Sequence, residues 1–122
     1  MTNRAQRLGQ SGERLAADFL EKQGYSIVDR NVRRREGEID IVAVDGDTLV
    51  LAEVKVRRPT GAGKATESLS DAKKRRMSEL AIAYAADHPE LPANLRIDLI
   101  AIDLKVDGSV GSVQHVKSAV ER

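Results

Sequence analysis

Two stretches in the middle of the chain alternate between apolar and polar residues with the two-residue period of a β-strand. In Thr48–Val56, every even-numbered position after Thr48 is apolar, whereas the odd-numbered positions begin with leucines and end with Glu53 and Lys55. Glu38–Val44 also alternates, and the Asp45-Gly46-Asp47 sequence between the two stretches is typical of a tight hairpin turn. The pattern therefore predicts two neighbouring antiparallel strands.

Apolar residues recur at helical spacing in two other segments. The first predicted helix begins at about Arg4 or Ser11, continues to Gln23 and stops at Gly24, a residue type that often follows a helix. Its predicted packing stripe consists of Leu8, Gly12, Leu15, Ala16 and Phe19. The second predicted helix covers Ser70–Ala86, with Ser70 as its N-cap. Its predicted apolar stripe consists of Met77, Leu80, Ala81 and Tyr84.

Three further strands and one long loop complete the predicted order of elements. The strands are Tyr25–Arg30, Leu95–Leu104 and an edge strand at Ser112–Lys117, and the loop is Pro59–Ser68. The resulting order, α-β-β-β-α-β-β, predicts an α/β fold with three layers, in which helices flank a central mixed sheet. The length of 122 residues suits one domain, 1–122, with one core.

Composition narrows the chemistry that the chain can perform. Hydrophobic residues at 41% and charged residues at 32% indicate a globular protein, and the low aromatic content of 2% leaves aliphatic residues to fill the core. The absence of cysteine excludes disulfides, cysteine-ligated zinc and thiol catalysis. We expect no membrane partner, because no apolar stretch approaches the roughly 20 residues of a membrane span. These features are compatible with a cytoplasmic address.

Carboxylates on otherwise apolar strands are the most unusual feature of the sequence. A two-residue hairpin would place Val44 beside Leu49, and continuing that register brings Asp40 beside Glu53. Two carboxylates about 5 Å apart repel each other by roughly 3 kcal/mol at an effective dielectric constant near 20. Lys55 or a divalent metal with oxygen ligands would offset that repulsion. A purely structural ion-pair cluster is the alternative interpretation.

Basic residues are clustered although the formal net charge is only +1. The clusters flank the predicted carboxylates along the chain, where they would contact phosphates. Any one cluster on its own would be read as a solvated surface. The clusters are Arg33-Arg34-Arg35, Arg57-Arg58 and Lys73-Lys74-Arg75-Arg76.

The Gly37-Glu38-Ile39-Asp40 string, followed after a hairpin by Glu53-Val54-Lys55, resembles the PD-(D/E)xK nuclease superfamily. That superfamily includes restriction endonucleases and archaeal Holliday junction resolvases. With Gly12-Glu13, Gly24-Tyr25 and Arg30-Asn31 in the same order, the chain more closely resembles the YraN-like family of bacterial proteins, from about Gly9 to Asp103. The superfamily motif alone is weak, and the whole ordered set is specific. The resemblance implies a restriction-endonuclease-like fold.

The resemblance also implies roles for individual residues. Asp40 and Glu53, helped by the Val54 carbonyl, would ligate Mg²⁺ or Mn²⁺ as the cofactor. Lys55 would orient or activate the attacking water, and Glu13 would add a third acidic group. Ile39 stands where the superfamily's name has proline, which removes no ligand. The residues expected to contact nucleic acid are Arg34, Arg35, Arg57, Arg58 and Lys73.

Several other polar residues are assigned structural places. Glu38 is expected to pair with a nearby arginine, and Arg96 with Asp98 on the same strand face. Tyr25 is expected in the core or at its rim. His88 and His115 are interpreted as surface residues, because neither has a metal-ligating partner at useful spacing.

The function predicted from these observations is metal-dependent endonucleolytic hydrolysis of phosphodiester bonds in DNA, with branched or damaged DNA as a candidate substrate. The alternative is a nucleic-acid-binding or scaffold protein that retains the nuclease fold with little or no catalysis. Intact Asp40, Glu53 and Lys55 favour the enzyme, and the modest net charge favours the alternative. The sequence leaves a homodimer open.

Overall fold

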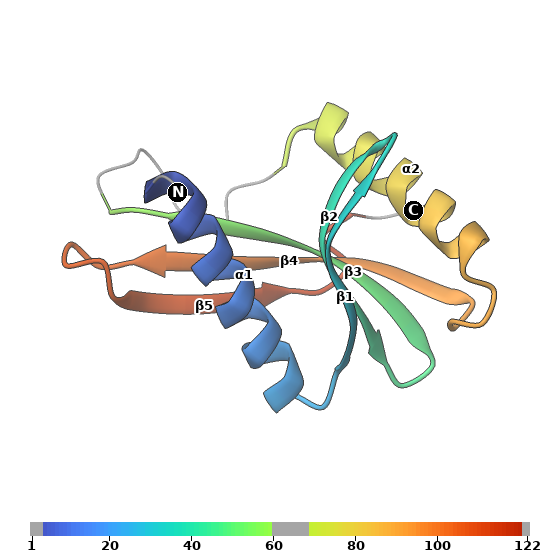
Figure 1. Ribbon diagram of the computed structural model, residues 1–122, viewed down its shortest axis with the longest axis horizontal. Coiled ribbons are helices and arrows are strands. Elements are labelled where there is room, and N and C mark those ends of the chain that lie inside the picture. Colours follow the sequence, from blue (N-terminus) through green and yellow to red (C-terminus); the bar gives the residue numbers. More distant parts are fainter. Residues whose placement is uncertain (1–3, 60–68, 121–122) are drawn as a thin grey trace.

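A computed structural model describes residues 4–59 and 69–120 of the chain. Within these residues, one mixed sheet carries five strands in their sequence order, and β3 and β4 are its one parallel pair (Figure 1). The strands are β1 (Ser26–Arg34), β2 (Gly37–Asp45), β3 (Thr48–Arg57), β4 (Asn94–Leu104) and β5 (Val110–Val116). The helices are α1 (Arg4–Lys22) and α2 (Asp71–Asp87), and α2 lies in the crossover between the two parallel strands. The predicted element order and the mixed α/β sheet are confirmed.

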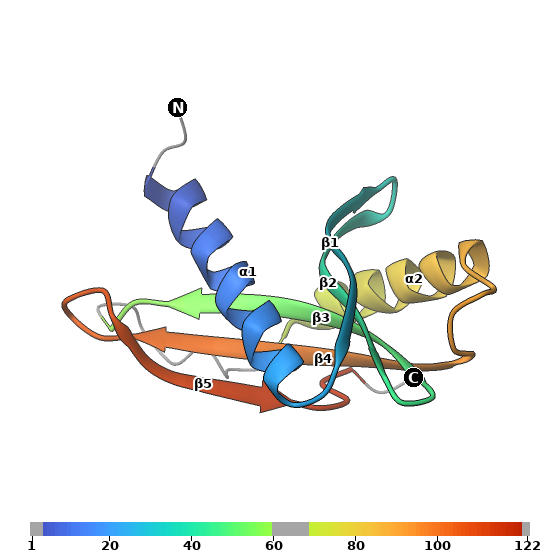
Figure 2. The same ribbon diagram turned by 60° about the horizontal axis from the view of Figure 1, so that its bottom comes forward.

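Each helix packs on its own face of the sheet, so the core has two halves. On the α1 face, Ala16, Ala17 and Leu20 meet apolar residues of β2, β3 and β4. On the α2 face, all four residues of the predicted stripe are buried against the other side of the same strands. The fold therefore has three layers. Figure 2 shows the far end of the β1–β2 hairpin curling away from the other three strands.

The hairpin between β2 and β3 has the register predicted from the sequence. Val44 pairs with Leu49, and the ladder ends at the pair of Ile41 and Ala52. Gly46 in the turn has a φ of +61°, a value that glycine adopts without strain. Asp40 lies one residue beyond the last ladder pair, which points it toward the end of β3 that carries Glu53.

The helix ends follow the sequence signals, but the α1 stripe differs from the prediction. Gly24 follows α1 with a φ of +94°, and Ser70 caps α2 by accepting a hydrogen bond from the Lys73 N–H at 3.1 Å. Leu15, predicted to pack, is 39% exposed. The buried line of α1 runs four residues apart through Gly12, Ala16 and Leu20, which turns Leu15 toward solvent. The Leu8 side chain, also predicted to pack, lies outside the described part of the structure.

Gly12 sets the distance between α1 and the sheet. A Cβ at this position would lie 2.5 Å from Cγ2 of Val56 on β3. We expect Gly12→Ala to lower the free energy of unfolding by about 1–2 kcal/mol, because overpacking outweighs the roughly 1 kcal/mol gain in helix propensity. Urea denaturation measures the change. In the double variant Gly12→Ala/Val56→Ala, the smaller side chain at position 56 should restore part of the lost free energy of unfolding. If the effects of the two substitutions simply added, the close contact between the two positions would be contradicted.

The end of β1 differs from the predicted one for a local reason. The first strand was predicted to end at Arg30, yet β1 continues to Arg34 beyond Asn31, which has a φ of +56°. A register shift between Ile27 and Asp29 marks a bulge in the same strand, and bulges break the alternation on which sequence prediction relies.

Of the predicted loop, residues 60–68 lie outside the described part of the chain. No helix among the described residues is long and apolar enough to cross a membrane.

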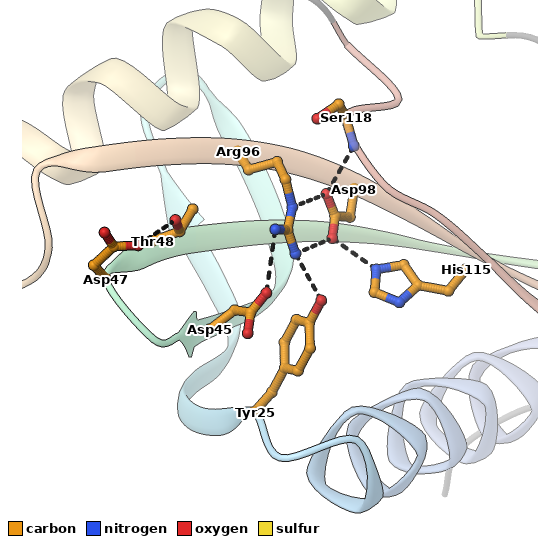
Figure 3. A network of polar contacts seen from close by, with 8 residues as sticks. All are labelled: Tyr25, Asp45, Asp47, Thr48, Arg96, Asp98, His115 and Ser118. Carbon is orange, nitrogen blue, oxygen red and sulfur yellow. Dashed lines mark hydrogen bonds and ion pairs between the residues drawn. The ribbon is translucent and has the colours of Figure 1, made fainter.

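A buried polar network joins β4 to the chain's C-terminal segment (Figure 3). Asp98 is fully buried, and it accepts hydrogen bonds from the Arg96 guanidinium at 2.9 and 3.0 Å and from the Ser118 N–H at 3.0 Å. His115 Nε2 lies 2.6 Å from the same carboxylate, and Arg96 also reaches the Tyr25 hydroxyl at 2.6 Å. The predicted Arg96–Asp98 pair and the buried place of Tyr25 are confirmed.

The prediction that both histidines lie on the surface is wrong. The His115 side chain is only 6% exposed, since Phe19 and Tyr25 pack edge-on against its ring. His88 is half-buried, stacks on Tyr84 at 4.0 Å between ring centroids and hydrogen-bonds the Tyr84 carbonyl. Both imidazoles serve the packing of the fold.

Candidate active site

Asp40 and Glu53 lie together on the α2 face of the sheet, where β2 diverges from β3. Both side chains line one cavity, and Asp40 Oδ2 accepts a hydrogen bond from the Val54 N–H at 2.8 Å. Burial, followed by the charge of Glu53, raises the pKa of Asp40 from 3.8 to about 7, although the Val54 hydrogen bond opposes the rise. Two buried carboxyl groups this close together repel each other when both are ionised, and a cation bound between them would remove that repulsion.

The carboxyl pair opens into a cavity between the β1–β2 hairpin and the first turns of α2. Its volume is about 220 Å³, and its lining combines apolar, acidic and basic side chains. The lining residues are Gly37, Glu38, Asp40, Glu53, Lys73, Arg76, Met77 and Leu80. The close fit of Gly37 on α2, where an added Cβ would lie 3.3 Å from Leu80 and 3.6 Å from Arg76, fixes the hairpin side of this cavity.

Lys73 bridges the cavity from α2 to β3. Its Nζ atom lies 2.6 Å from Glu53 Oε1, and the lysine side chain is 43% exposed whereas that of Glu53 is 17% exposed. The sequence pointed to Lys73 only as a phosphate contact and did not anticipate this ion pair. The contact requires α2 to lie over the end of β3, which no local pattern specifies.

Lys55 and Val54 follow Glu53 on β3. Lys55 is half-buried and in register with Ala101 of β4, and strand alternation directs it to the same face as Glu53. It stands outside the residues that line the cavity. The Val54 N–H is used by Asp40, and the Val54 side chain packs in the α1 half of the core.

Glu13, on α1, influences Asp40 through its charge. It is half-buried, and burial raises its pKa, opposed by the charge of Arg30 and assisted by that of Glu38. The negative charge of Glu13 contributes to the raised pKa of Asp40. A third acidic group thus acts electrostatically on Asp40.

The basic residues divide into those engaged within the protein and those exposed. Arg34 forms ion pairs with Asp87 at the end of α2 and with Glu36, which ties the β1–β2 hairpin to that helix. Arg35 and Arg58 are exposed, whereas Arg57 is half-buried. The predicted pairing of Glu38 is confirmed, since the Arg33 guanidinium lies 2.9 Å from its carboxylate.

The donor set fits a hard divalent cation that keeps part of its water shell. Among the residues described, no three His, Cys, Asp or Glu side chains are grouped closely enough to form a complete metal cage. Mg²⁺ and Mn²⁺ do not need one, because they bind through one or two carboxylates and complete their shells with water and substrate phosphate. Asp40 and Glu53 supply two carboxylates beside a cavity that has room for such ligands.

Comparisons with known proteins identify relatives along nearly the whole chain. Residues 12–102 match the model of a family described as "Uncharacterised protein family UPF0102". A UPF0102 protein of Renibacterium salmoninarum is 46% identical over 90% of this chain and 92% of its own. One from Paenarthrobacter aurescens is 50% identical over 78% of each chain. One from Roseiflexus castenholzii is 44% identical over 99% of this chain and 98% of its own.

Proposed function

Given that the chain belongs to the UPF0102 family, the YraN-like family that its motifs indicated, we propose that it is a metal-dependent endonuclease hydrolysing phosphodiester bonds in DNA. One observation carries the proposal: Asp40 and Glu53, from adjacent strands, bring two carboxyl groups to one cavity with a basic wall. Buried structural carboxylates are normally satisfied by cationic donors, as Asp98 is in this protein. Asp40 instead faces a second carboxylate.

The chain's own residues supply binding and proton chemistry to this site. Asp40, Glu53 and the Val54 carbonyl would hold Mg²⁺ or Mn²⁺, which when bound supplies Lewis-acid polarisation of a phosphoryl oxygen. Lys55 would hold the attacking water through its Nζ and stabilise negative charge that develops on the phosphate. Lys73 and Arg76 form the basic wall on α2 and would orient the substrate backbone.

Cleavage of defined DNA substrates tests the proposal. The full chain is incubated with linear, flapped and four-way DNA in the presence of Mg²⁺, Mn²⁺ or a chelator. We expect metal-dependent cleavage that Glu53→Gln abolishes, since the amide keeps the shape of the side chain but lacks its charge. DNA binding without cleavage under every condition would favour the alternative, a nucleic-acid-binding or scaffold protein with the nuclease fold.

Lys55→Ala is expected to reduce the rate of cleavage about 100-fold or more and to leave DNA affinity nearly unchanged. The lysine would interact with the reacting groups, where one lost interaction costs roughly 3 kcal/mol in the transition state. Cleavage rate, affinity and melting temperature are measured on the same preparation. If Lys55 served only a structural cluster, the melting temperature would fall with no separate loss of catalysis.

The matched control replaces exposed arginines outside the cavity. Arg35→Ala combined with Arg58→Ala should weaken DNA binding and reduce the slope of log affinity against log salt by about two contacts' worth. The rate of cleavage at saturating DNA should stay close to the wild-type rate. A Lys55→Ala protein that folds, binds DNA and cuts normally would exclude the role assigned to that lysine.

A further inference from the structure

Lys73 places a positive charge directly on one of the two carboxylates that would hold a metal. Its side chain extends from the first turn of α2, where Ser70 fixes the backbone, across the cavity to Glu53. The 2.6 Å separation between Lys73 Nζ and Glu53 Oε1 is that of a charge-assisted hydrogen bond. The protein therefore already supplies one cation to the site.

We propose that Lys73 is an internal counter-ion that occupies the cation position of the Asp40–Glu53 site, and that a divalent metal must displace it in order to bind. This inference rests on the proposed function, because it assumes that the carboxyl pair is a metal site. It adds a regulatory contact to that site: the lysine keeps the empty site neutralised and weakens metal binding in the absence of substrate.

The exposure of the two partners supports displacement of the lysine rather than of the glutamate. The Lys73 side chain is 43% exposed and sits on a flexible four-carbon stem, so its ammonium can move into water. Glu53 is 17% exposed on a central strand between β2 and β4, which holds its carboxylate beside Asp40. A metal entering the cavity would therefore meet fixed carboxylates and a movable ammonium.

Competition of this kind has a calculable effect on affinity. If the Lys73–Glu53 pair is formed in about nine molecules out of ten, the apparent Kd for a metal is raised about tenfold. Removal of the positive charge at position 73 should therefore tighten metal binding by roughly that factor. A lysine that instead helped to bind the metal, or only stabilised the fold, would give unchanged or weaker binding on removal.

Titration with Mn²⁺ in the absence of nucleic acid, followed by electron paramagnetic resonance or calorimetry, tests the inference. We expect Lys73→Gln to bind Mn²⁺ about tenfold more tightly than the wild type, and Lys73→Arg, which keeps the charge, to remain close to the wild type. Lys74→Gln is the matched control, because Lys74 is the next residue on α2 and half-buried as Lys73 is. Circular dichroism verifies that each variant is folded.

The possible results separate the counter-ion from the metal site itself. If the wild type binds Mn²⁺ and Lys73→Gln binds it no more tightly, the counter-ion role is wrong and the metal site stands. If Lys73→Gln and Lys74→Gln tighten binding equally, the effect is one of general charge and the specific role is again wrong. If neither the wild type nor Lys73→Gln binds Mn²⁺, both the counter-ion and the proposed metal-dependent function are overturned.

Discussion

Asp98→Ala is expected to lower the free energy of unfolding by about 3–5 kcal/mol, a large fraction of the stability of a domain of this size. The substitution removes the acceptor shared by Arg96, His115 and the Ser118 N–H, and the Arg96 side chain is only 18% exposed. Leaving a guanidinium and an imidazole without that acceptor costs more than the lost hydrogen bonds themselves. Urea denaturation near neutral pH measures the loss.

The same network makes a second, pH-dependent contribution. Burial by itself would raise the pKa of Asp98, but hydrogen bonds from His115, Arg96 and the Ser118 N–H outweigh it and lower the pKa below 3.8. A carboxyl group with a lowered folded pKa stabilises the protein above its unfolded pKa, and that stabilisation is lost as the pH falls through the folded value. Asp98→Asn should therefore flatten the acid limb of the stability profile. Losses below about 1 kcal/mol in Asp98→Ala would contradict this account.

The β2–β3 hairpin was predictable in detail because three local signals agree. Alternation assigned the faces of both strands, the turn sequence fixed the loop length, and a two-residue loop leaves one register. The neighbourhood of Asp40 and Glu53 follows from that register alone. This part of the candidate site therefore depends on contacts close in sequence.

Lys73 and His115 were not predictable in the same way. Lys73 contacts Glu53 because the connection between the parallel strands β3 and β4 places α2 over β3. The helical spacing of apolar residues does not predict which turn of the helix packs over which strand. The position of His115 depends on the β4–β5 register, which shifts between Asp103 and Leu104. A one-residue slip moves a side chain to the opposite face, so alternation cannot locate His115 across that irregularity.

One signal for the Asp98 network was nevertheless present in the sequence. Asp98 interrupts an apolar run in β4, and a buried carboxylate requires several donors. The sequence indicates Arg96, on the same strand face, as one donor, and its guanidinium bonds both oxygens of Asp98, but each carboxylate oxygen can accept a further hydrogen bond. A search of the following strand for a further donor would have placed His115 among the candidates, beside Ser112 and Gln114.

Asp40→Asn is expected to abolish metal-dependent cleavage and, without metal, to stabilise the protein. In the unfolded chain the carboxyl group ionises near pH 3.8, whereas in the folded protein its pKa is about 7. The folded state thus holds a proton that the unfolded state has released, and stability falls as the pH rises between these values. The difference corresponds to as much as about 4 kcal/mol above the folded pKa.

Asparagine removes this penalty and keeps the local contacts. Its amide oxygen can still accept the Val54 N–H, and its amide nitrogen can donate to Glu53. Urea denaturation with a chelator at about pH 5 and about pH 8 should show a stabilised variant mainly at the higher pH. Asp18→Asn, at an exposed position on α1, is the control and should follow the wild type at both values.

Adding metal should reverse the order of stability if the carboxyl pair binds a cation. A ligand that binds only the folded state stabilises it by an amount that grows with the ratio of free ligand to Kd. Wild-type protein should therefore gain stability with Mn²⁺ at about pH 8, while Asp40→Asn gains little, because it has lost one of two charged ligands. If the two proteins showed the same dependence of stability on pH in the presence of a chelator, folding would not raise the pKa of Asp40. Equal gains with Mn²⁺ would locate the metal elsewhere. We expect the Asp40 carboxylate to destabilise the metal-free protein and to be compensated by a bound cation. Such a residue contributes to binding or catalysis at a cost in folding stability.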